Sequence, residues 1–341
     1  MYEIGRYDFP EPEHFVVWYE CKKRHRAVSL EFLRSFVDQR DITRALKVAR
    51  DLDTDALLIT RNDSPERGDK KLQKLFQSCA FRQFQPRFNS TLPATCLVDH
   101  HDLLFERYIK DNVAVVRFQD ERFVYKFMNT TCLQDTFETE ERNYQKLAGV
   151  AGIPPLKAAV RKDGVVHGLL IPYIDGEDLW SVATTSSGVG DLDSGLLNIT
   201  YGIISLAAML EKQRHFYHQD LKCSNIVRRT HDGELFFVDL AGGLTKGMYR
   251  PEREGHILRN GFDAADAVFS LGRTVWSLWT GRAPATIVSV EAVRDDVVRD
   301  IVTDCEEGRV GCIGALYEKY VPIASSQGES LTESLLGLMM R

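Results

Sequence analysis

The chain has 341 residues, of which 44% are hydrophobic and 27% charged, and its formal net charge is −6. This balance is ordinary for a soluble globular protein, and it gives no reason to expect a basic nucleic-acid surface. The first fifteen residues lack the apolar run of a signal peptide, and no stretch is apolar over the length of a membrane span. We therefore expect a cytoplasmic protein, with the nucleus as the alternative compartment.

The seven cysteines are scattered, and none forms a C-x-x-C pair. That spacing argues against a zinc cluster and favours free thiols in a reducing compartment.

The sequence pattern over residues 1–100 predicts an N-terminal α/β extension, and it does not indicate what the role of this extension is. Phe15–Tyr19 has the composition of a strand, and an apolar stripe from Ser29 to about Leu52 predicts a helix. The basic run Lys22–Arg26 is typical of a solvated loop.

From residue 103 the pattern becomes β-rich and then, after Gly176, mostly helical, which indicates the α+β class. A helix is predicted at Thr136–Ala148, with Asp135 as its cap, Glu138 completing a capping box, and Gly149 at its end. The strands are predicted at 104–109, 113–118, 122–128, 156–160 and 165–171, and the later helices at 194–213, 263–280, 290–304 and 330–340.

Two segments carry the strongest chemical signal. Residues 218–225 read His-Gln-Asp-Leu-Lys-Cys-Ser-Asn, and residues 235–242 form an apolar run that ends in Asp-Leu-Ala-Gly. Together they resemble the catalytic loop and the metal-binding motif of the eukaryotic protein kinases, over residues 103–341. The resemblance implies a protein-kinase-like bilobal fold, with an N-lobe at 103–173 and a C-lobe at 177–341, after the N-terminal extension.

The resemblance also implies the roles of four side chains in phosphoryl transfer, which needs an aligned nucleophile, magnesium and positive charge. Asp220 would orient the acceptor hydroxyl and take its proton. Lys222 would neutralise charge on the phosphoryl group, and it marks the serine/threonine type. Asn225 and Asp239 would hold Mg²⁺ through oxygen atoms, the ligands that this ion prefers. The implied cofactors are ATP and Mg²⁺, and the implied partner is a protein substrate.

A second group of residues resembles the family's nucleotide-binding strand and helix. Alternation along the strand puts Val124 and Lys126 on one face. Val124 would then cover the adenine, and Lys126 would grip the phosphates. The predicted helix carries Glu140 on its apolar stripe, where it would hold Lys126, with Glu141 as the alternative.

Residues 169–179 resemble the hinge between the two lobes. The backbone N–H of Ile174 would donate to the adenine ring, and Pro172 keeps the carbonyl that the adenine amine requires. Asp178 would reach the ribose hydroxyls. The alternative for Asp178 is the N-cap of the helix that follows.

The chain departs from the family in ways that bear on activity. The turn at residues 109–112 contains no glycine, and the metal motif reads Asp-Leu-Ala. Gln219 stands where an arginine usually binds an activation-loop phosphate, and the segment 239–252 is short. We therefore expect no need for such a phosphate, and we expect that replacing Thr245 and Tyr249 leaves turnover within a few-fold.

Two further departures concern the helical part. Asp266 lies one place earlier than the matching residue of the family's core helix. Glu329 stands about where the family has an arginine, so that Glu252, in the closing motif Arg250-Pro251-Glu252, would need another partner.

Three functions are therefore open. The first is an active serine/threonine kinase. The second is a pseudokinase or binding scaffold, which the missing glycines favour. The third is a small-molecule phosphotransferase of the aminoglycoside-kinase kind, which the short segment after Asp239 suits but Lys222 does not.

Overall fold

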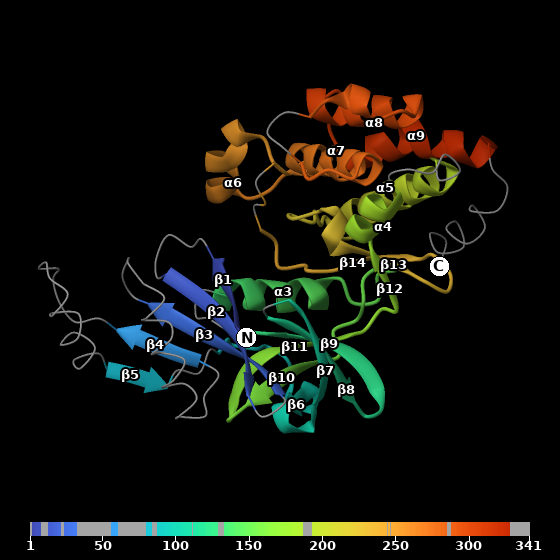
Figure 1. Cartoon of the computed structure of the whole chain (residues 1–341). Coiled ribbons are helices and arrows are strands. Elements are labelled where there is room, and N and C mark those ends of the chain that lie inside the picture. Colours follow the sequence, from blue (N-terminus) through green and yellow to red (C-terminus); the bar gives the residue numbers. More distant parts are fainter. Residues whose placement is uncertain are drawn as a thin grey trace, which may run out of the picture. The chain divides into compact units, whose positions relative to one another are not determined.

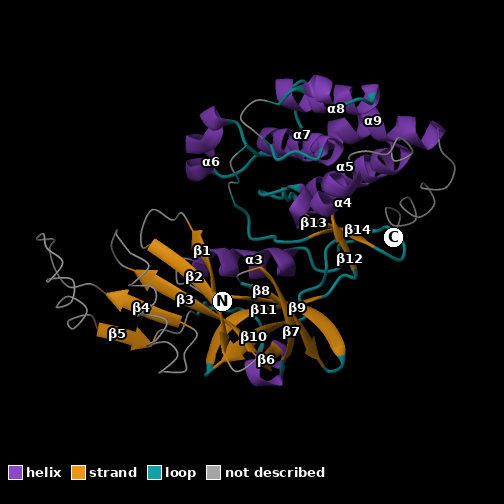
Figure 2. Ribbon diagram, in the orientation of Figure 1, coloured by secondary structure: helices purple, strands orange, loops and turns teal. Residues whose placement is uncertain are grey.

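The structure is a computed structural model that describes residues 2–7, 13–21, 24–32, 56–60, 80–83, 87–110, 112–128, 133–186, 193–243, 245, 247–284 and 288–327. Its class is mixed α+β, as predicted (Figure 2). The chain divides into two compact units, Met1–Glu138 with Lys157–Tyr173, and Thr139–Leu156 with Ile174–Arg341.

The first unit contains a five-stranded sheet formed early in the chain, in the order β1-β2-β3-β4-β5. All neighbours are antiparallel except β3 and β4, which run parallel. The strands are β1 (Tyr2–Tyr7), β2 (Glu13–Cys21), β3 (Arg24–Phe32), β4 (Ala56–Thr60) and β5 (Ala80–Gln83).

This sheet confirms the strand predicted at Phe15–Tyr19 and corrects two other predictions. Ser29–Phe32 ends β3 instead of starting a helix, because these residues pair with both β2 and β4. A segment this short, with apolar residues only at Leu30 and Phe32, fits either period, and here strand pairing decides the outcome. The remainder of the predicted helix, residues 33–52, lies outside the described residues. The end of the basic run, Arg24–Arg26, also belongs to β3 and not to a loop.

A second sheet of the same unit has six strands in the order β6-β10-β11-β9-β8-β7 (Figure 1). It confirms the five strands predicted after residue 103, with ends shifted by at most two residues. The strands are β6 (Leu97–Asp99), β7 (Leu104–Lys110), β8 (Val113–Phe118), β9 (Glu121–Phe127), β10 (Ala158–Lys162) and β11 (Val165–Pro172).

Two tight turns fix the register of this sheet. Gln119 and Asp120 join β8 to β9 with φ of 51° and 64°, and Asp163 and Gly164 join β10 to β11 with φ of 50° and 83°. Positive φ at both central residues matches the right-handed twist of the paired strands. One face of the sheet is buried around an apolar cluster of Leu103, Ala114, Val116, Phe123, Tyr125, Ala158, Val160 and Leu170.

Helix α3 (Gln134–Lys146) confirms the predicted helix but begins earlier than expected. Asp135 therefore lies within the first turn and does not cap the helix. The Glu138 carboxylate accepts from the Asn89 N–H at 3.1 Å and from the Gln134 amide at 3.0 Å, so the predicted capping box is wrong. Gly149, expected after the helix, has a positive φ of 77°.

The second unit is mainly helical, with a small sheet in the order β12-β13-β14. Figure 1 shows α5, α7, α8 and α9 grouped together, and α7 is buried along Asp266–Leu278. The strands and helices of the second unit after residue 174 are β12 (Gly176–Asp178), α4 (Leu179–Ser186), α5 (Asp193–Arg214), β13 (Ile226–Arg229), β14 (Leu235–Phe237), α6 (Glu254–Asn260), α7 (Ala264–Thr280), α8 (Asp296–Glu307) and α9 (Ile313–Gln327).

The predicted helices 194–213 and 263–280 are confirmed as α5 and α7, whereas the helix predicted at 290–304 begins later. Val290–Ala292 forms a separate 3-10 turn. Asp295 then caps α8 by accepting from the Val298 N–H at 2.9 Å. The predicted helix at 330–340 and Glu329 lie outside the described residues.

Candidate functional site

The loop at residues 218–225 brings three of the predicted residues together. Lys222 donates from Nζ to Asp220 Oδ2 at 2.5 Å. Asn225 donates from Nδ2 to the Asp220 carbonyl at 2.9 Å and to Oδ2 at 3.2 Å. Asp220 Oδ1 is buried, and within the described ranges no group hydrogen-bonds to it. The aspartate is thus held through one oxygen, and the other stays available to accept a proton.

His218 joins this loop to the strand that leads into Asp239. Its Nδ1 accepts from the Asp220 N–H at 3.3 Å, so Nε2 carries the proton and donates to the Val238 carbonyl at 2.9 Å. Burial lowers the pKa of His218, which favours this neutral form. The Val238 N–H in turn donates to the Asn225 carbonyl at 3.0 Å. His218 was part of the motif in the sequence, but no sequence pattern indicated this linking role.

Asp239 has a left-handed backbone, with φ of 61°. Such a conformation costs about 1–3 kcal/mol in a residue other than glycine, and it persists where the surrounding structure holds it. The residues on both sides supply that restraint. Val238 is bonded to the loop as described, and the Leu240 carbonyl accepts from Asn143 Nδ2 at 2.6 Å. A strained residue held in this way is typical of a functional site.

Two side-chain hydroxyls of helix α7 hold the loop at residues 218–225 in place. The Leu221 carbonyl accepts from Thr274 Oγ1 at 2.6 Å and from Ser270 Oγ at 3.2 Å. Cys223 donates from Sγ to the Thr274 carbonyl at 3.4 Å, and burial raises the pKa of this thiol to about 12. Ser270 and Thr274 are four residues apart and therefore share one helix face, a signal that the sequence did contain.

Asp266, which lies one place earlier than the matching residue of the family that the chain resembles, contacts the start of its own helix and Arg253. It forms a capping box with Asp263 at the start of α7. Its Oδ1 also accepts from Arg253 Nε at 3.0 Å, and its Oδ2 accepts from Arg253 Nη2 at 2.9 Å. The early position of Asp266 is therefore explained by helix capping and ion pairing.

Thr245 is a site residue that the sequence did not identify. Its hydroxyl accepts from Lys222 Nζ at 2.9 Å, so Lys222 bridges Asp220 and Thr245. This contact gives a physical reason to revise the expectation that replacing Thr245 leaves turnover within a few-fold. Gly242 has φ of 79°, and a Cβ there would lie 2.7 Å from Gln219 Oε1. The turn after Asp239 therefore requires glycine at this position.

The segment after Asp239 ends at Arg250, which fastens it to α8. The Arg250 guanidinium donates to the carbonyls of Cys305 at 3.3 Å and Glu306 at 2.9 Å, in the last turn of that helix. It also lies 4.9 Å from the centroid of the Phe269 ring. A cation at a helix C-terminus is favourable. Arg250, and not the exposed Glu252, is therefore the anchoring residue of this motif.

In the first unit, Val124 and Lys126 lie on one face of β9, as alternation predicted. The cross-strand partners of Lys126 are Val113 and Leu169. Lys126 is only 8% exposed, and its Nζ lies 5.8 Å from the Phe137 ring centroid. A nearly buried lysine between apolar neighbours differs from the solvated lysine that is usual on a strand.

The apolar stripe of α3 is confirmed, because Phe137, Glu140, Tyr144 and Leu147 are all buried. Glu141 is buried as well, so burial does not decide between the two glutamates. Burial, together with the charges of Glu140 and Asp239, raises the pKa of Tyr144 well above its ordinary range. Tyr144 is therefore a neutral phenol close to both acids.

Asp178 caps helix α4. Its Oδ1 accepts from the Ser181 N–H and its Oδ2 from the Ser181 hydroxyl, both at 3.0 Å. This geometry confirms the N-cap alternative. The ribose role of Asp178 and the adenine contact of Ile174 stay predictions.

The oxygen atoms of Asp239 and Asn225 fit a magnesium ion whose other ligands are phosphate and water. Among the described residues no group of three or more His, Cys, Asp or Glu side chains could hold a metal. Mg²⁺ commonly takes only one or two protein carboxylates and completes its shell with phosphate and water. Asp239 offers a carboxylate, and Asn225, whose Nδ2 faces Asp220, has its amide oxygen turned away from that residue.

Comparison with known proteins gives no independent assignment. No family model matches the chain, and no curated protein matches it. Of the helices that the structure describes, none combines the length and apolar character needed to cross a bilayer.

Proposed function

We propose that the chain is a phosphotransferase of the protein-kinase kind, which transfers the γ-phosphoryl group of ATP to a serine or threonine hydroxyl of a protein. The observation that carries this proposal is the buried Asp220 Oδ1, which has no hydrogen-bond partner among the described residues while Lys222 and Asn225 hold Oδ2. An orphaned carboxylate oxygen at a fixed position is the arrangement that a hydroxyl nucleophile requires.

Each protein group then has one task. Asp220 accepts the hydroxyl proton at Oδ1 and thereby aligns the attacking oxygen. Lys222 holds Asp220 through Oδ2 and supplies positive charge beside the reacting oxygens. Asp239 and Asn225 would hold Mg²⁺, which neutralises phosphate charge when it is bound. Because His218 and Asn225 both bond to Val238, the base and the proposed metal ligand keep a fixed spacing.

The nucleotide would be bound by residues that the resemblance indicates. Lys126 would bind the phosphates, and Glu140 would hold Lys126. Val124 and Ile174 would contact the adenine, and Asp178 the ribose. The burial of Lys126 supports the first role, because a lysine on a strand is normally solvated.

A binding scaffold on the same fold is the second candidate. One observation favours it: the β7–β8 turn has no glycine, and glycine allows close approach of backbone to phosphate. The constellation of Asp220, Lys222 and Asn225 argues for the enzyme, because a scaffold does not need it. A small-molecule phosphotransferase remains the third candidate.

The test combines nucleotide binding with turnover. Mg-ATP should raise the melting temperature of the wild-type protein, and ATP consumption should depend on a protein acceptor. Asp220→Asn should lower turnover by about 10²-fold or more and keep the thermal shift. Asp239→Asn should reduce the magnesium-dependent part of the shift.

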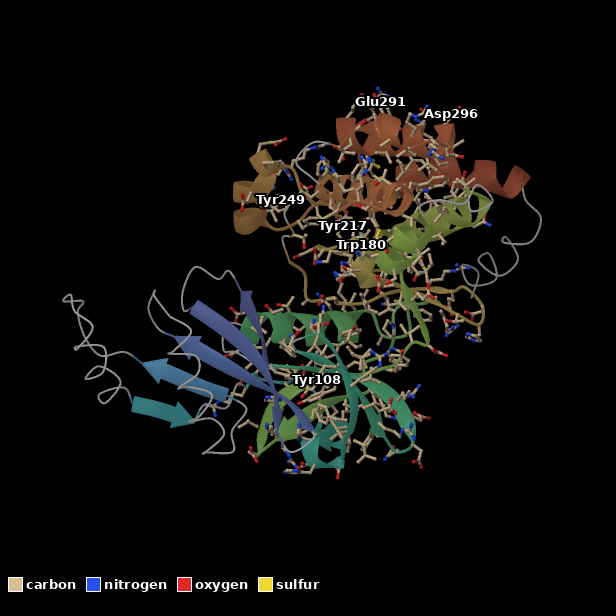
Figure 3. The ribbon with its side chains drawn as sticks, viewed as in Figure 1. Tyr108, Trp180, Tyr217, Tyr249, Glu291 and Asp296 are labelled. Atoms are coloured by element: carbon tan, nitrogen blue, oxygen red, sulfur yellow. The ribbon has the colours of Figure 1, made fainter. Side chains whose placement is uncertain are left out.

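The matched control is Asp296→Asn, because Asp296 lies exposed at the start of α8 (Figure 3). It should behave as the wild type. A thermal shift without turnover in any acceptor mixture would favour the scaffold. Turnover with aminoglycosides but not with proteins would favour the small-molecule enzyme, and an absence of any nucleotide effect would refute both phosphotransferases.

A further inference from the structure

The side chain of Asn143 connects α3 to the segment that follows Asp239. Its Nδ2 donates to the Leu240 carbonyl at 2.6 Å, across 97 positions of sequence. Leu240 is buried, so its carbonyl depends on a protein donor for satisfaction. Asparagine is a weak helix former, which makes an interior helix position unusual unless the side chain has a specific partner.

This bond completes a set of restraints around Asp239. The preceding residue, Val238, is held from the loop by His218 and Asn225. The following residue, Leu240, is held from α3 by Asn143. Restraint from both sides is what a left-handed aspartate needs, because the unrestrained backbone would relax to a negative φ.

The same turn of α3 carries the acids and the phenol described above. Glu140 and Asn143 are three positions apart and are therefore neighbours on the helix surface. Tyr144 follows, buried and close to Asp239. A displacement of α3 would therefore move the Glu140 carboxylate and loosen the Asp239 backbone together.

We propose that Asn143 is a positioning residue that latches α3 to Leu240 and so fixes the carboxylate of Asp239 for magnesium. The inference rests on the proposed function for the identity of the ligand. The latch itself is a property of the ligand-free protein. It makes the geometry of Asp239 a part of the fold, with no requirement for a modified residue in the segment that follows.

The experiment compares two replacements of Asn143 with one control. Asn143→Ala removes the donor, and since alanine is the best helix former, a loss cannot arise from a weaker helix. Asn143→Gln keeps the donor on a longer stem and should restore part of the wild-type behaviour. Arg142→Ala changes an exposed residue of the same helix, whose guanidinium bonds to the Thr139 hydroxyl, and should have no effect.

Two readouts separate the latch from the enzyme activity. The first is hydrogen–deuterium exchange of the peptide covering residues 235–243 in the ligand-free protein, where Asn143→Ala should exchange several-fold faster. The second is the Mg²⁺ concentration that gives half-maximal ATP turnover at saturating ATP. It should rise about 10-fold, as expected when a residue that orients a metal ligand is lost.

The outcomes are distinct. Unchanged exchange in residues 235–243 would overturn the proposal, and so would faster exchange spread evenly over both units, which would mean a general loss of stability. Faster local exchange with an unchanged Mg²⁺ requirement would also overturn it. Faster local exchange in a protein whose wild type binds no Mg-ATP would keep the latch and refute the proposed function. Should Asn143→Ala fail to fold, Asn143→Gln and Asn143→Asp supply the same comparison.

Discussion

Replacement of Thr274 by valine removes one hydroxyl beneath the loop and keeps the volume of the side chain. The Leu221 carbonyl then retains the Ser270 hydroxyl, its longer contact at 3.2 Å. The loss is therefore that of one neutral hydrogen bond, about 1 kcal/mol. Ser270→Ala should cost less, about 0.5 kcal/mol, because Thr274 at 2.6 Å remains the better donor.

The double variant should cost more than the sum of the two single changes. With both hydroxyls absent, the buried Leu221 carbonyl has no side-chain donor left among the described residues. An unsatisfied buried acceptor costs about 1–3 kcal/mol, so the total should reach about 3 kcal/mol. The coupling between the two sites is then about 1.5 kcal/mol, within the range seen for residues that share a partner.

The assay is urea unfolding at equilibrium, followed by tryptophan fluorescence, to which Trp276 and Trp279 of α7 contribute as two of the four tryptophans. Wild type, the two single variants and the double variant complete the thermodynamic cycle. A double variant whose cost equals the sum of the single costs, within about 0.5 kcal/mol, would refute the idea that one carbonyl is shared. Loss of turnover in the double variant with stability unchanged would also contradict the reasoning.

Three further predictions follow from the site and the sheet. Thr245→Val should lower turnover by about 10-fold through loss of the Lys222 contact, whereas Thr245→Ser should stay close to the wild type, as steady-state kinetics would show. Burial lowers the pKa of His167 to about 3, below the pKa of histidine in the unfolded chain. Protonation of His167 therefore favours the unfolded state. The free energy of unfolding should fall as the pH drops from about 6.5 towards 3, by up to about 1.4 kcal/mol per pH unit. His167→Phe should flatten that slope, as urea unfolding at several pH values would show, whereas replacement of the exposed His101 should leave it unchanged. Equal slopes in the two variants would rule out His167 as the source of the pH dependence. Gly242→Ala should destabilise the protein by about 1 kcal/mol or more, whereas Gly243→Ala, where the nearest atom to a new Cβ is 3.8 Å away, should be tolerated in the same measurement.

Local periodicity predicted most of the described elements after residue 103. The strands β7 to β9 are short runs rich in β-branched and aromatic residues, and α5 and α7 have sustained apolar patterns, so pairing and packing agree with local preference. The errors fall where a short segment fits two structures. In Ser29–Phe32 the two apolar residues, Leu30 and Phe32, fit a strand as well as the start of a helical stripe, and the pairing with β4 depends on residues far along the chain.

The candidate site was predictable only in part, for a physical reason. Asp220, Lys222 and Asn225 lie within one short loop, so their spacing in sequence reports their closeness in space. Thr245 and Asn143 act through contacts across 23 and 97 positions, and no local pattern encodes such a contact. Asp178 shows the opposite case, because an acid before a helix is a local signal and the capping geometry was foreseen.

The attachment of Arg250 to the last turn of α8 limits which changes of length the segment from Asp239 to Arg250 can accept. Both ends of the stretch from Asp239 to Arg250 are fastened, one by backbone bonds at Val238 and the other by the guanidinium at the α8 carbonyls. A segment that is attached at both ends tolerates substitution better than deletion. When a residue is removed, the shorter segment can span the same distance only if the contacts at one end are lost. Variants that shorten this stretch should therefore release Arg250 first.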